Sequence, residues 1–451
     1  MQDHLGNPVS AMASGALAGV DDFVSGFLAY EKQAVNVLGA ADMHPDATLA
    51  NIYAGMIWMF LEAPEAPAQA AKYVGAARAT AASANERERA LLGLLEAWAA
   101  NDMPLAEAIG LDIVRRWPND LATMKLAQYM AFNRGDAARM LMLAQTVEAA
   151  NRDNAHWHGM AAFGHEQCHD LAAAEKAAWR ALELKHKEPW AQHALAHVMI
   201  TEGRNQEGIA FMDSVTPTWT NLNSFMYTHN WWHKALFNIS LGNFAAVFDA
   251  YDAHVWGQEK GYSQDQVGAV SLLARMECAG LDVGERWQDV ADWMRPRAND
   301  TTQPFLTLQY LYGLARAERA EADCLMAAIV DKAGDASGHE RVAWSDVALP
   351  AARGLLALAR GDHPAAVLNL RAALPRMREI GGSHAQRDLF EQLYLDALLK
   401  AGNDPAARDM MEMRRTFDPD GVPLNRMLAE TCDRLGLTEE AAAARARTAP
   451  G

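Results

Sequence analysis

Short polar turns, each followed by an alanine-rich amphipathic run, recur along this chain. Four of these turns begin 34 residues apart, at Asn101, Gly135, His169 and Gly203. Within the run "AAAEKAAWRALEL", the small and apolar residues fall at i, i+3, i+4, i+7 and i+8 and so share one helix face: Ala174, Ala177, Ala178, Ala181 and Leu182. The pattern predicts repeated pairs of α-helices and no strands.

The same register continues with looser spacing towards the C-terminus. Further turns begin at Gly242, Gly361, Gly402 and Gly436, with less distinct ones near Gly280 and Arg319. A 34-residue period with a Gly-Asp or Gly-Asn turn is typical of tetratricopeptide repeats, in which two antiparallel helices form each unit and neighbouring units stack. We therefore expect an all-α superhelix, or solenoid, with a concave central pocket.

Three segments of this expected solenoid differ in the clarity of their repeats. Residues 1–85 have helical patterns but degenerate repeats, as expected of an N-terminal cap. Residues 86–260 contain the clear repeats and many of the chain's histidines. Residues 261–451 are expected to form C-terminal helical repeats and a second cap.

The stretch "HEQCH", from His165 to His169, matches the H-E-x-x-H signature of zinc proteases. Such a site needs both histidines one turn apart in the middle of a helix, so that they face the same metal. His169 instead occupies the turn position that Gly135 and Gly203 hold in the neighbouring units. We therefore predict that the helix carrying His165 ends at about Cys168, and that this motif is not a zinc-protease site.

The repeat register also indicates which residues face the concave side. In tetratricopeptide repeats, the first helix of each unit lines the groove. Counting back from the turns places a set of polar and aromatic residues there: Tyr129, His156, Glu166, Trp190, His193, His197, His229 and Trp232. His233, four residues after His229, lies either on the groove or in the seam between helices.

Two pairs of histidines, His193 with His197 and His229 with His233, have the i, i+4 spacing that stacks side chains on one helix face about 6 Å apart. Imidazole serves as a general acid or base near neutral pH and also ligates metals. We predict that these four histidines, with Glu166, form a catalytic group. Tyr129, His156, Trp190 and Trp232 are expected to bind the substrate.

Three uses of this cluster were weighed. A small-molecule or peptide pocket with catalytic ability comes first, and a polar groove without chemistry comes second. A metal site comes last, because two pairs on separate helices could lie too far apart, so no cofactor is predicted. The plainer alternative is that each histidine is packed or solvent-facing and that the two tryptophans belong to the core.

A second polar stretch, "IGGSHAQRDLFEQ", is expected to reach the rim of the site. Much of it has a structural explanation, because Ser383 and Gln386 fit a capping box and Arg387 can pair with Glu391 at i, i+4. His384 and Asp388 are left without one. We predict that four residues of this stretch help to bind the substrate: His384, Gln386, Arg387 and Asp388.

Three long stretches of the chain resemble the tetratricopeptide repeat protein 38 family: "HALAHVMITEGRNQEGIAFM", "THNWWHKALFNISLGNFAAVFDAYDAHV" and "GGSHAQRDLFEQLYLDAL". The resemblance runs from about Glu86 to Gly402. It implies an α-solenoid and brings no settled biochemical activity with it. It also implies that several candidate residues belong to a family pattern: His193, His197, His229, Trp232, His233, Gln386, Arg387 and Asp388.

Charge and cysteine content narrow the expected partners and compartment. With 57 acidic and 40 basic residues, the chain lacks the cationic surface that nucleic acids and anionic membranes attract, so neither is an expected partner. The four cysteines are far apart, which favours a reducing, cytoplasmic compartment. The apolar run "IYAGMIWMFL" is half as long as the about twenty residues of a membrane span. Homo-oligomers are compatible with the apolar ends of an open solenoid.

Two functional hypotheses follow. In the first, the chain is an enzyme, a hydrolase or lyase in which one imidazole acts as base or nucleophile and another stabilises developing charge on a small polar or aromatic substrate. In the second, it is a binding module or scaffold that holds a peptide, metabolite or protein without transforming it. A closed pocket of converging imidazoles favours the first, and an open groove favours the second.

Overall fold

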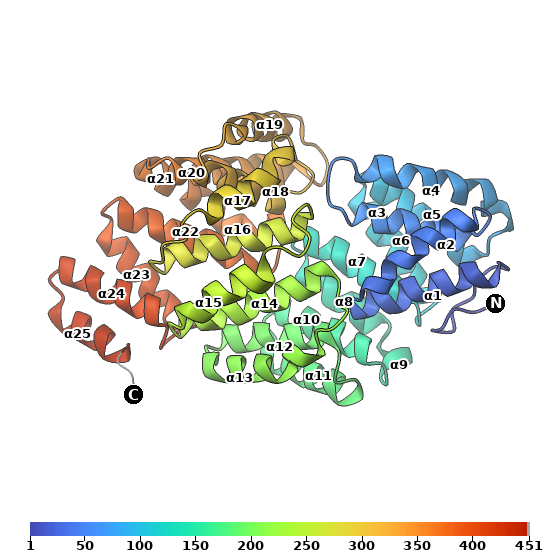
Figure 1. Ribbon diagram of the computed structural model, residues 1–451, viewed down its shortest axis with the longest axis horizontal. Coiled ribbons are helices and arrows are strands. Elements are labelled where there is room, and N and C mark those ends of the chain that lie inside the picture. The colour runs from blue at the N-terminus through green and yellow to red at the C-terminus, as the bar shows by residue number, and fades with distance from the viewer. Residues whose placement is uncertain (449–451) are drawn as a thin grey trace. The chain divides into compact units, whose positions relative to one another are not determined.

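A computed structural model describes residues 1–448 of the chain as helices joined by short turns (Figure 1). No strand forms within this range, where the extended pairings are two isolated bridges, Gln2 with Pro8 and Glu31 with Leu222. None of the helices within residues 1–448 combines the length and apolar character needed to cross a bilayer. The prediction of an all-α fold is confirmed.

The chain divides into two compact units, residues 1–195 with 218–226 and residues 196–217 with 227–451. Two helices contain a boundary between units, α12 (Pro189–Thr201) and α14 (Ser224–Ser240). The first unit otherwise contains α1 (Ser14–Ala29), α2 (Asn36–Met43), α3 (Thr48–Met59), α4 (Ala66–Thr80), α5 (Glu86–Ala99), α6 (Met103–Arg116), α7 (Leu121–Asn133), α8 (Ala137–Thr146), α9 (Glu148–Asn151), α10 (Ala155–Gln167) and α11 (Leu171–Leu184). The predicted division at residues 85 and 260 stays a prediction.

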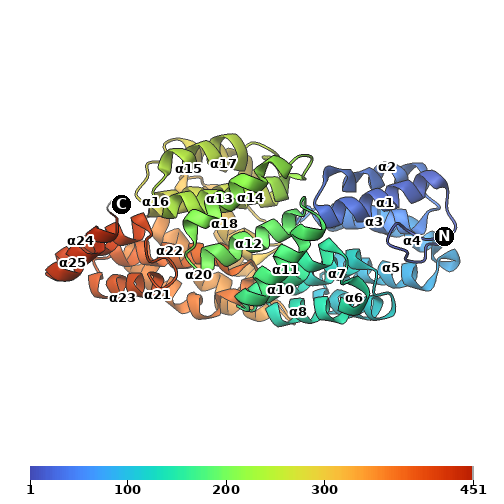
Figure 2. The ribbon, with the colours of Figure 1, turned by 90° about the horizontal axis from the view of Figure 1, so that it is seen from below.

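The second unit continues the helix pairs to the C-terminal side. It contains α13 (Asn205–Val215), α15 (Phe244–Ala250), α16 (Ser263–Cys278), α17 (Arg286–Met294), α18 (Pro304–Arg316), α19 (Glu321–Asp335), α20 (Leu349–Ala359), α21 (His363–Ala373), α22 (His384–Lys400), α23 (Asp404–Arg414), α24 (Val422–Arg434) and α25 (Thr438–Arg447). Figure 2 shows α23, α24 and α25 following one another at the C-terminal end, and each packs on the next.

Short 3-10 and π segments lie between several of these helices. The 3-10 segments are Lys32–Val35, Ala81–Ser83, Thr216–Thr218, Arg295–Arg297 and Leu374–Ile380. The π-helical turns are Tyr251–Val255 and Ala343–Ala348, which extend α15 and precede α20 respectively.

A left-handed residue ends the first helix of each predicted pair. Asn101, Gly135, His169 and Gly203 have φ between 58° and 69°. The amide that follows each of them bonds back to a carbonyl five residues earlier, as when Asp136 N–H donates to Ala131 O at 2.9 Å. These are the paired bonds of a Schellman motif, which satisfies the last carbonyls of a helix and reverses the chain.

The same turn recurs along the second unit. Positive φ values mark Gly242, Gly280, Glu318, Gly361, Gly402 and Gly436, each at the end of a helix. The spacing predicted for the repeats is therefore confirmed, and the less distinct turns are placed at Gly280 and Glu318. Glu318 lies one residue before the predicted Arg319.

Small residues allow the two helices of a pair to approach closely. Gly354 on α20 shows this, because a Cβ atom there would lie 2.9 Å from the backbone nitrogen of Leu370 on α21. Gly208 on α13 is similar, since a Cβ atom would lie 2.3 Å from the ring of Phe237 on α14. Such contacts tighten the packing of helix pairs, as the alanine-rich pattern predicts.

The segment before α24 packs on two of the left-handed turns. A Cβ atom at Gly203 would lie 2.6 Å from the carbonyl oxygen of Phe417. The next residue, Asp418, accepts hydrogen bonds from Asn205 at 2.9 Å and Ser240 at 2.6 Å. Glycine at position 203 therefore meets two requirements. It adopts a left-handed backbone conformation, and it leaves room for the main chain at Phe417.

The two demands on Gly203 can be separated by mutation. We expect Gly402→Ala, which has open space around its Cβ position, to cost about 1–2 kcal/mol of unfolding free energy through left-handed strain alone. Gly203→Ala should cost about 1–3 kcal/mol more, because the methyl group also meets the Phe417 carbonyl. Urea unfolding of the two variants measures the difference, and equal losses would contradict the close-approach argument.

Candidate functional site

Helices α12 and α14 carry the two histidine pairs at the predicted i, i+4 spacing. Pro189 is the first residue of α12, a position where its missing N–H costs no helical hydrogen bond. All four histidines are buried, with at most 8% of any residue exposed. The helices thus direct four imidazoles away from solvent.

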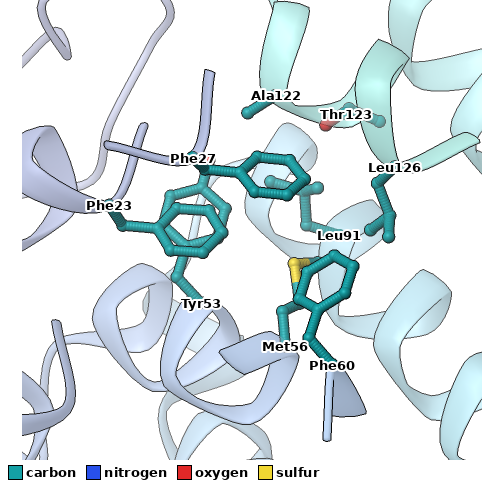
Figure 3. A pocket seen from close by; sticks show the side chains of 9 residues that line it. All are labelled: Phe23, Phe27, Tyr53, Met56, Phe60, Leu91, Ala122, Thr123 and Leu126. Carbon is teal, nitrogen blue, oxygen red and sulfur yellow. The ribbon is translucent and has the colours of Figure 1, made fainter. Parts of the chain in front are cut away.

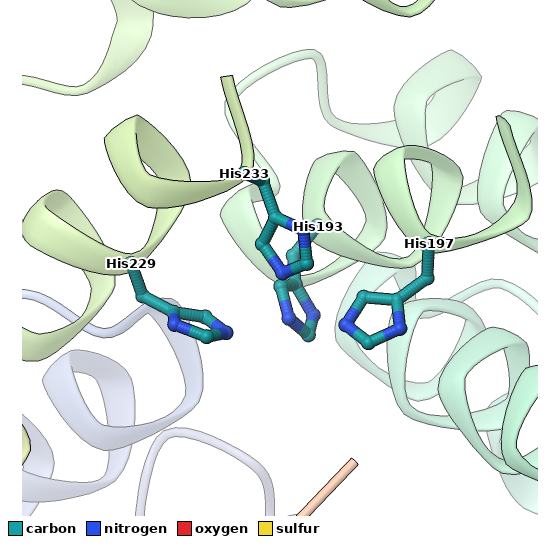
Figure 4. Close-up of side chains that lie close together, drawn as sticks. All are labelled: His193, His197, His229 and His233. Carbon is teal, nitrogen blue, oxygen red and sulfur yellow. The ribbon is translucent and has the colours of Figure 1, made fainter. Parts of the chain in front are cut away.

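The four rings converge (Figure 4). In the second unit, the ring centroids of His197 and His233 lie 4.6 Å apart, and those of His229 and His233 lie 4.7 Å apart. His193 precedes His197 by one turn on α12, and each of the four residues offers one ring nitrogen within 4.8 Å of the others. We call His193, His197, His229 and His233 the imidazole cluster.

A tryptophan stacks on the outer ring of each pair. The indole of Trp190 lies 4.4 Å from the His193 ring with an interplanar angle of 16°. Trp232 lies 5.2 Å from the His229 ring at 10°, and the Arg275 guanidinium lies 5.1 Å from the Trp232 ring centre. These stacks fix the planes of two of the imidazoles, because offset stacking is the favoured geometry of such rings.

His384 brings a fifth imidazole next to the cluster within the second unit. It is the first residue of α22, and its ring lies edge-on to His197 with centroids 5.3 Å apart. The Thr201 hydroxyl lies 3.0 Å from His384 Nε2 and also bonds to the His197 carbonyl at 2.8 Å. Of the four residues predicted on α22, His384 is the one that these contacts join to the cluster.

Burial controls the charge of the cluster. Burial lowers the pKa of His229 to about 3, with a smaller contribution from the neighbouring His197. Removal from water disfavours the charged imidazolium, so His229 is neutral at physiological pH. A neutral ring offers one nitrogen lone pair and one N–H group.

The "HEQCH" stretch has the predicted helix end. Helix α10 ends at Gln167, and His169 has a left-handed φ of 58°. The His165 ring bonds instead to Asp170 at 3.1 Å. The two histidines are therefore not successive-turn neighbours in the middle of a helix, and the predicted helix end near Cys168 is confirmed.

Three further predicted residues lie in the first unit with their own partners. Glu166 is fully buried on α10 and accepts a hydrogen bond from Gln167 at 2.5 Å. His156 Nδ1 lies 3.1 Å from Glu188. The Tyr129 hydroxyl donates to Glu62 at 2.6 Å. Their predicted catalytic and binding roles stay predictions.

Trp232 and the remaining residues of α22 have structural contacts. Trp232 is 1% exposed and belongs to the core of the second unit. Gln386 and Ser383 form the predicted capping box. Arg387 donates to the Gly382 carbonyl, which closes the turn before α22. Their substrate-binding roles also stay predictions.

Asp388 belongs to an ionic group that the sequence pattern did not reveal. Its carboxylate accepts a hydrogen bond from Arg414 at 2.5 Å, and Arg275 approaches to 4.0 Å. Burial alone would raise the pKa of Asp388, but the two arginines outweigh it and lower the pKa to about 2. No local motif links residues this far apart, so the grouping is a consequence of the fold.

Lys125 on α7 contacts the end of α1, a helix far from it in the sequence. It is 7% exposed, its ammonium lies 3.2 Å from the ring centre of Tyr30, and it donates to the carbonyls of Phe27 and Leu28. Burial lowers its pKa well below the usual value. Cations favour the last carbonyls of a helix, so Lys125 stabilises the end of α1.

A small cavity in the first unit is apolar (Figure 3). Its lining includes Phe23, Phe60 and Leu126, and its space for a water-sized sphere is about 10 Å³. That volume is near the lower limit for one water, and apolar cavities of this kind stay dry. It is a packing gap and not a ligand site.

The helix pairs and their left-handed turns define an all-α protein of the tetratricopeptide-repeat type. No protein family model matches the sequence. A structure of Naa15/Naa10 bound to HypK-THB is similar over 97% of this chain and 68% of that chain, with 12% identity and a TM-score of 0.26. A crystal structure of the P58(IPK) TPR domain is similar over 81% of this chain and 92% of that one, with 12% identity and a TM-score of 0.21. Similarity this low carries no argument about function.

The ion pair of Asp388 predicts a pH-dependent contribution to stability. Its pKa in the folded chain lies below the about 3.9 of an unfolded aspartate, so the stabilisation is present above that pH and is lost as the pH falls towards 2. We expect Asp388→Asn to lower the unfolding free energy by about 1–3 kcal/mol near pH 7, because it leaves Arg414 and Arg275 without their carboxylate. The deficit should shrink near pH 3.

The matched control is Asp396→Asn on the same helix, whose partner Lys400 is half exposed at 2.7 Å. That variant should lose no more than about 0.5 kcal/mol, because an i, i+4 pair whose lysine is 52% exposed is weak, whereas Arg414 and Arg275 are 19% and 2% exposed. Urea unfolding of both variants at each pH provides the measurement. An Asp388→Asn deficit that does not change with pH would show that the ion pair is not its source.

Proposed function

We propose that this chain is a tetratricopeptide-repeat binding module that holds its ligand at the imidazole cluster without transforming it. The convergence of four buried imidazoles from α12 and α14 carries this proposal. A helix seam that needs only packing is filled more favourably by apolar side chains, because a buried polar group must recover the interactions it loses with water. Four such groups in one place indicate a use beyond packing.

The stacked tryptophans support a binding role. Trp190 and Trp232 hold the rings of His193 and His229 in fixed planes. A group whose orientation is fixed before the ligand arrives loses little conformational entropy on binding. Catalysis would also need proton donors and acceptors matched to neutral pH, together with stabilisation of a transition state. The hydrolase or lyase hypothesis is therefore the second candidate.

We also propose that the chain belongs to the tetratricopeptide repeat protein 38 family. The three stretches that carry this resemblance supply the histidines of α12, the histidines of α14 and His384 of α22. In the second unit, the His197 ring lies next to the rings of His233 and His384. Sequence features far apart in the chain thus coincide with one polar cluster, as a shared functional site requires.

The ligand class proposed from this arrangement is a small polar or aromatic molecule, a peptide or an ion. Neutral imidazoles offer hydrogen bonds and lone pairs, and indoles offer flat apolar surface. Association of the chain with a second copy of itself, and interaction with a protein partner, are further proposals for this class of fold.

A native mass spectrum of the protein as purified tests the binding proposal without assuming the ligand. We expect the intact mass to exceed the sequence mass by one stoichiometric, non-covalent adduct that disappears on denaturation. The double variant His193→Ala/His229→Ala should lack that adduct, because it removes one imidazole from each helix.

The control variant is His165→Ala/His169→Gly, which removes two histidines from the "HEQCH" stretch and keeps the left-handed turn. It should retain the adduct. An adduct that survives in the cluster variant would place binding elsewhere in the chain. Turnover of the bound molecule, seen as a second mass appearing with time, would favour the enzyme hypothesis over a binding module.

A further inference from the structure

We propose that the ligand of the imidazole cluster is a single Zn²⁺ ion, held by ring nitrogens of His193, His197, His229 and His233. This inference rests on the proposed function, because it names the ligand of the same site. From the sequence, a metal is the least expected ligand, because the two pairs could lie too far apart. The ring nitrogens lie within 4.8 Å of one another, which removes that objection.

The separations of the donor atoms fit a four-ligand site after a small contraction. With Zn–N bonds of about 2.0–2.1 Å, the nitrogens around a tetrahedral ion are about 3.3 Å apart. The cluster therefore needs to contract by at most about 1.5 Å between any two donors. Small rotations of the imidazoles about their side-chain bonds, within their staggered wells, would shorten these separations.

The positions of the histidines on their helices also favour metal binding. Each helix provides two histidines one turn apart, and this spacing directs two imidazoles towards the same point. Stacking by Trp190 and Trp232 orients one ring of each pair. In metal sites, loss of a contact that orients a ligand ring typically costs about 10–100-fold in metal affinity.

The chemistry of the donors selects the ion. Imidazole nitrogen is a ligand of intermediate softness that suits Zn²⁺, Cu²⁺, Ni²⁺ and Co²⁺, whereas Mg²⁺ and Ca²⁺ prefer oxygen. Four buried imidazoles favour zinc, which accepts four nitrogen ligands and has no geometric preference from its d electrons. The net charge of −17 adds a long-range attraction for a cation.

A set of four protein ligands leaves no open coordination position for substrate. Catalytic zinc usually has three protein ligands and a water, whereas structural zinc has four protein ligands. The proposed ion therefore agrees with a site that binds without turnover. It would also join α12 to α14, because each helix provides two of the ligands.

Titration of metal-free, full-length protein with ZnCl₂ against a chromophoric chelator tests the proposal. We expect one Zn²⁺ per chain and a rise in the thermal midpoint when zinc is added, because the ion binds the folded chain. The variant His197→Gln/His233→Gln should lose more than about 100-fold in affinity, since removal of a contact behind the ligands already costs 10–100-fold. His165→Ala/His169→Gly should bind as the wild type does.

A second measurement covers the case in which the glutamine variant does not fold, which far-ultraviolet circular dichroism would reveal. X-ray absorption at the zinc edge of the wild-type protein counts the imidazole ligands directly. Three or four imidazoles support the proposal. Zero or one imidazole, or the absence of stoichiometric zinc binding, overturns it.

The two experiments distinguish the zinc proposal from the proposed binding function. In one outcome, the wild-type protein carries an organic adduct that the His193→Ala/His229→Ala variant lacks, and the wild type binds no zinc. That outcome would support the proposed binding function and reject the metal ion as the ligand. No adduct in the native mass spectrum and no zinc binding by the metal-free protein would reject both.

Discussion

The repeated left-handed turn is the constraint on which the rest of the structure depends. At each turn a single residue with positive φ ends one helix, and the paired Schellman bonds satisfy its last carbonyls before the chain reverses. Most of these positions are glycine, because other residues carry a steric penalty there. His169 and Glu318 show that the backbone requirement holds even where glycine is missing.

The turns also set where the imidazoles lie along their helices. His197 lies six residues before the turn at Gly203, and His233 lies nine residues before the turn at Gly242. The difference of three residues is close to one helical turn, so the two pairs keep similar faces while one is shifted along its axis. Residues with no local relation in the sequence thus acquire a common direction from the repeat.

The sequence alone predicted the helix pairs, the turn positions and the face shared by each histidine pair, because all three depend on local periodicity. It could not predict the separation between pairs on different helices, which depends on how closely the backbones pack at positions such as Gly208. The contact of Asp388 with Arg414 and Arg275 was missed for the same reason. The sequence pattern allows Trp232 to face either the groove or the core. Its burial and its contact with Arg275 are known only from the structure.

The composition of the imidazole cluster calls for an explanation beyond the packing of helices. Burial makes the charged form of His229 unfavourable, and a neutral imidazole still requires partners for its lone pair and its N–H group. Many other buried positions in the chain hold apolar side chains, so an apolar solution exists for a position that needs only packing. The binding role proposed for the cluster is an explanation for the convergence of four such groups at one place in the fold.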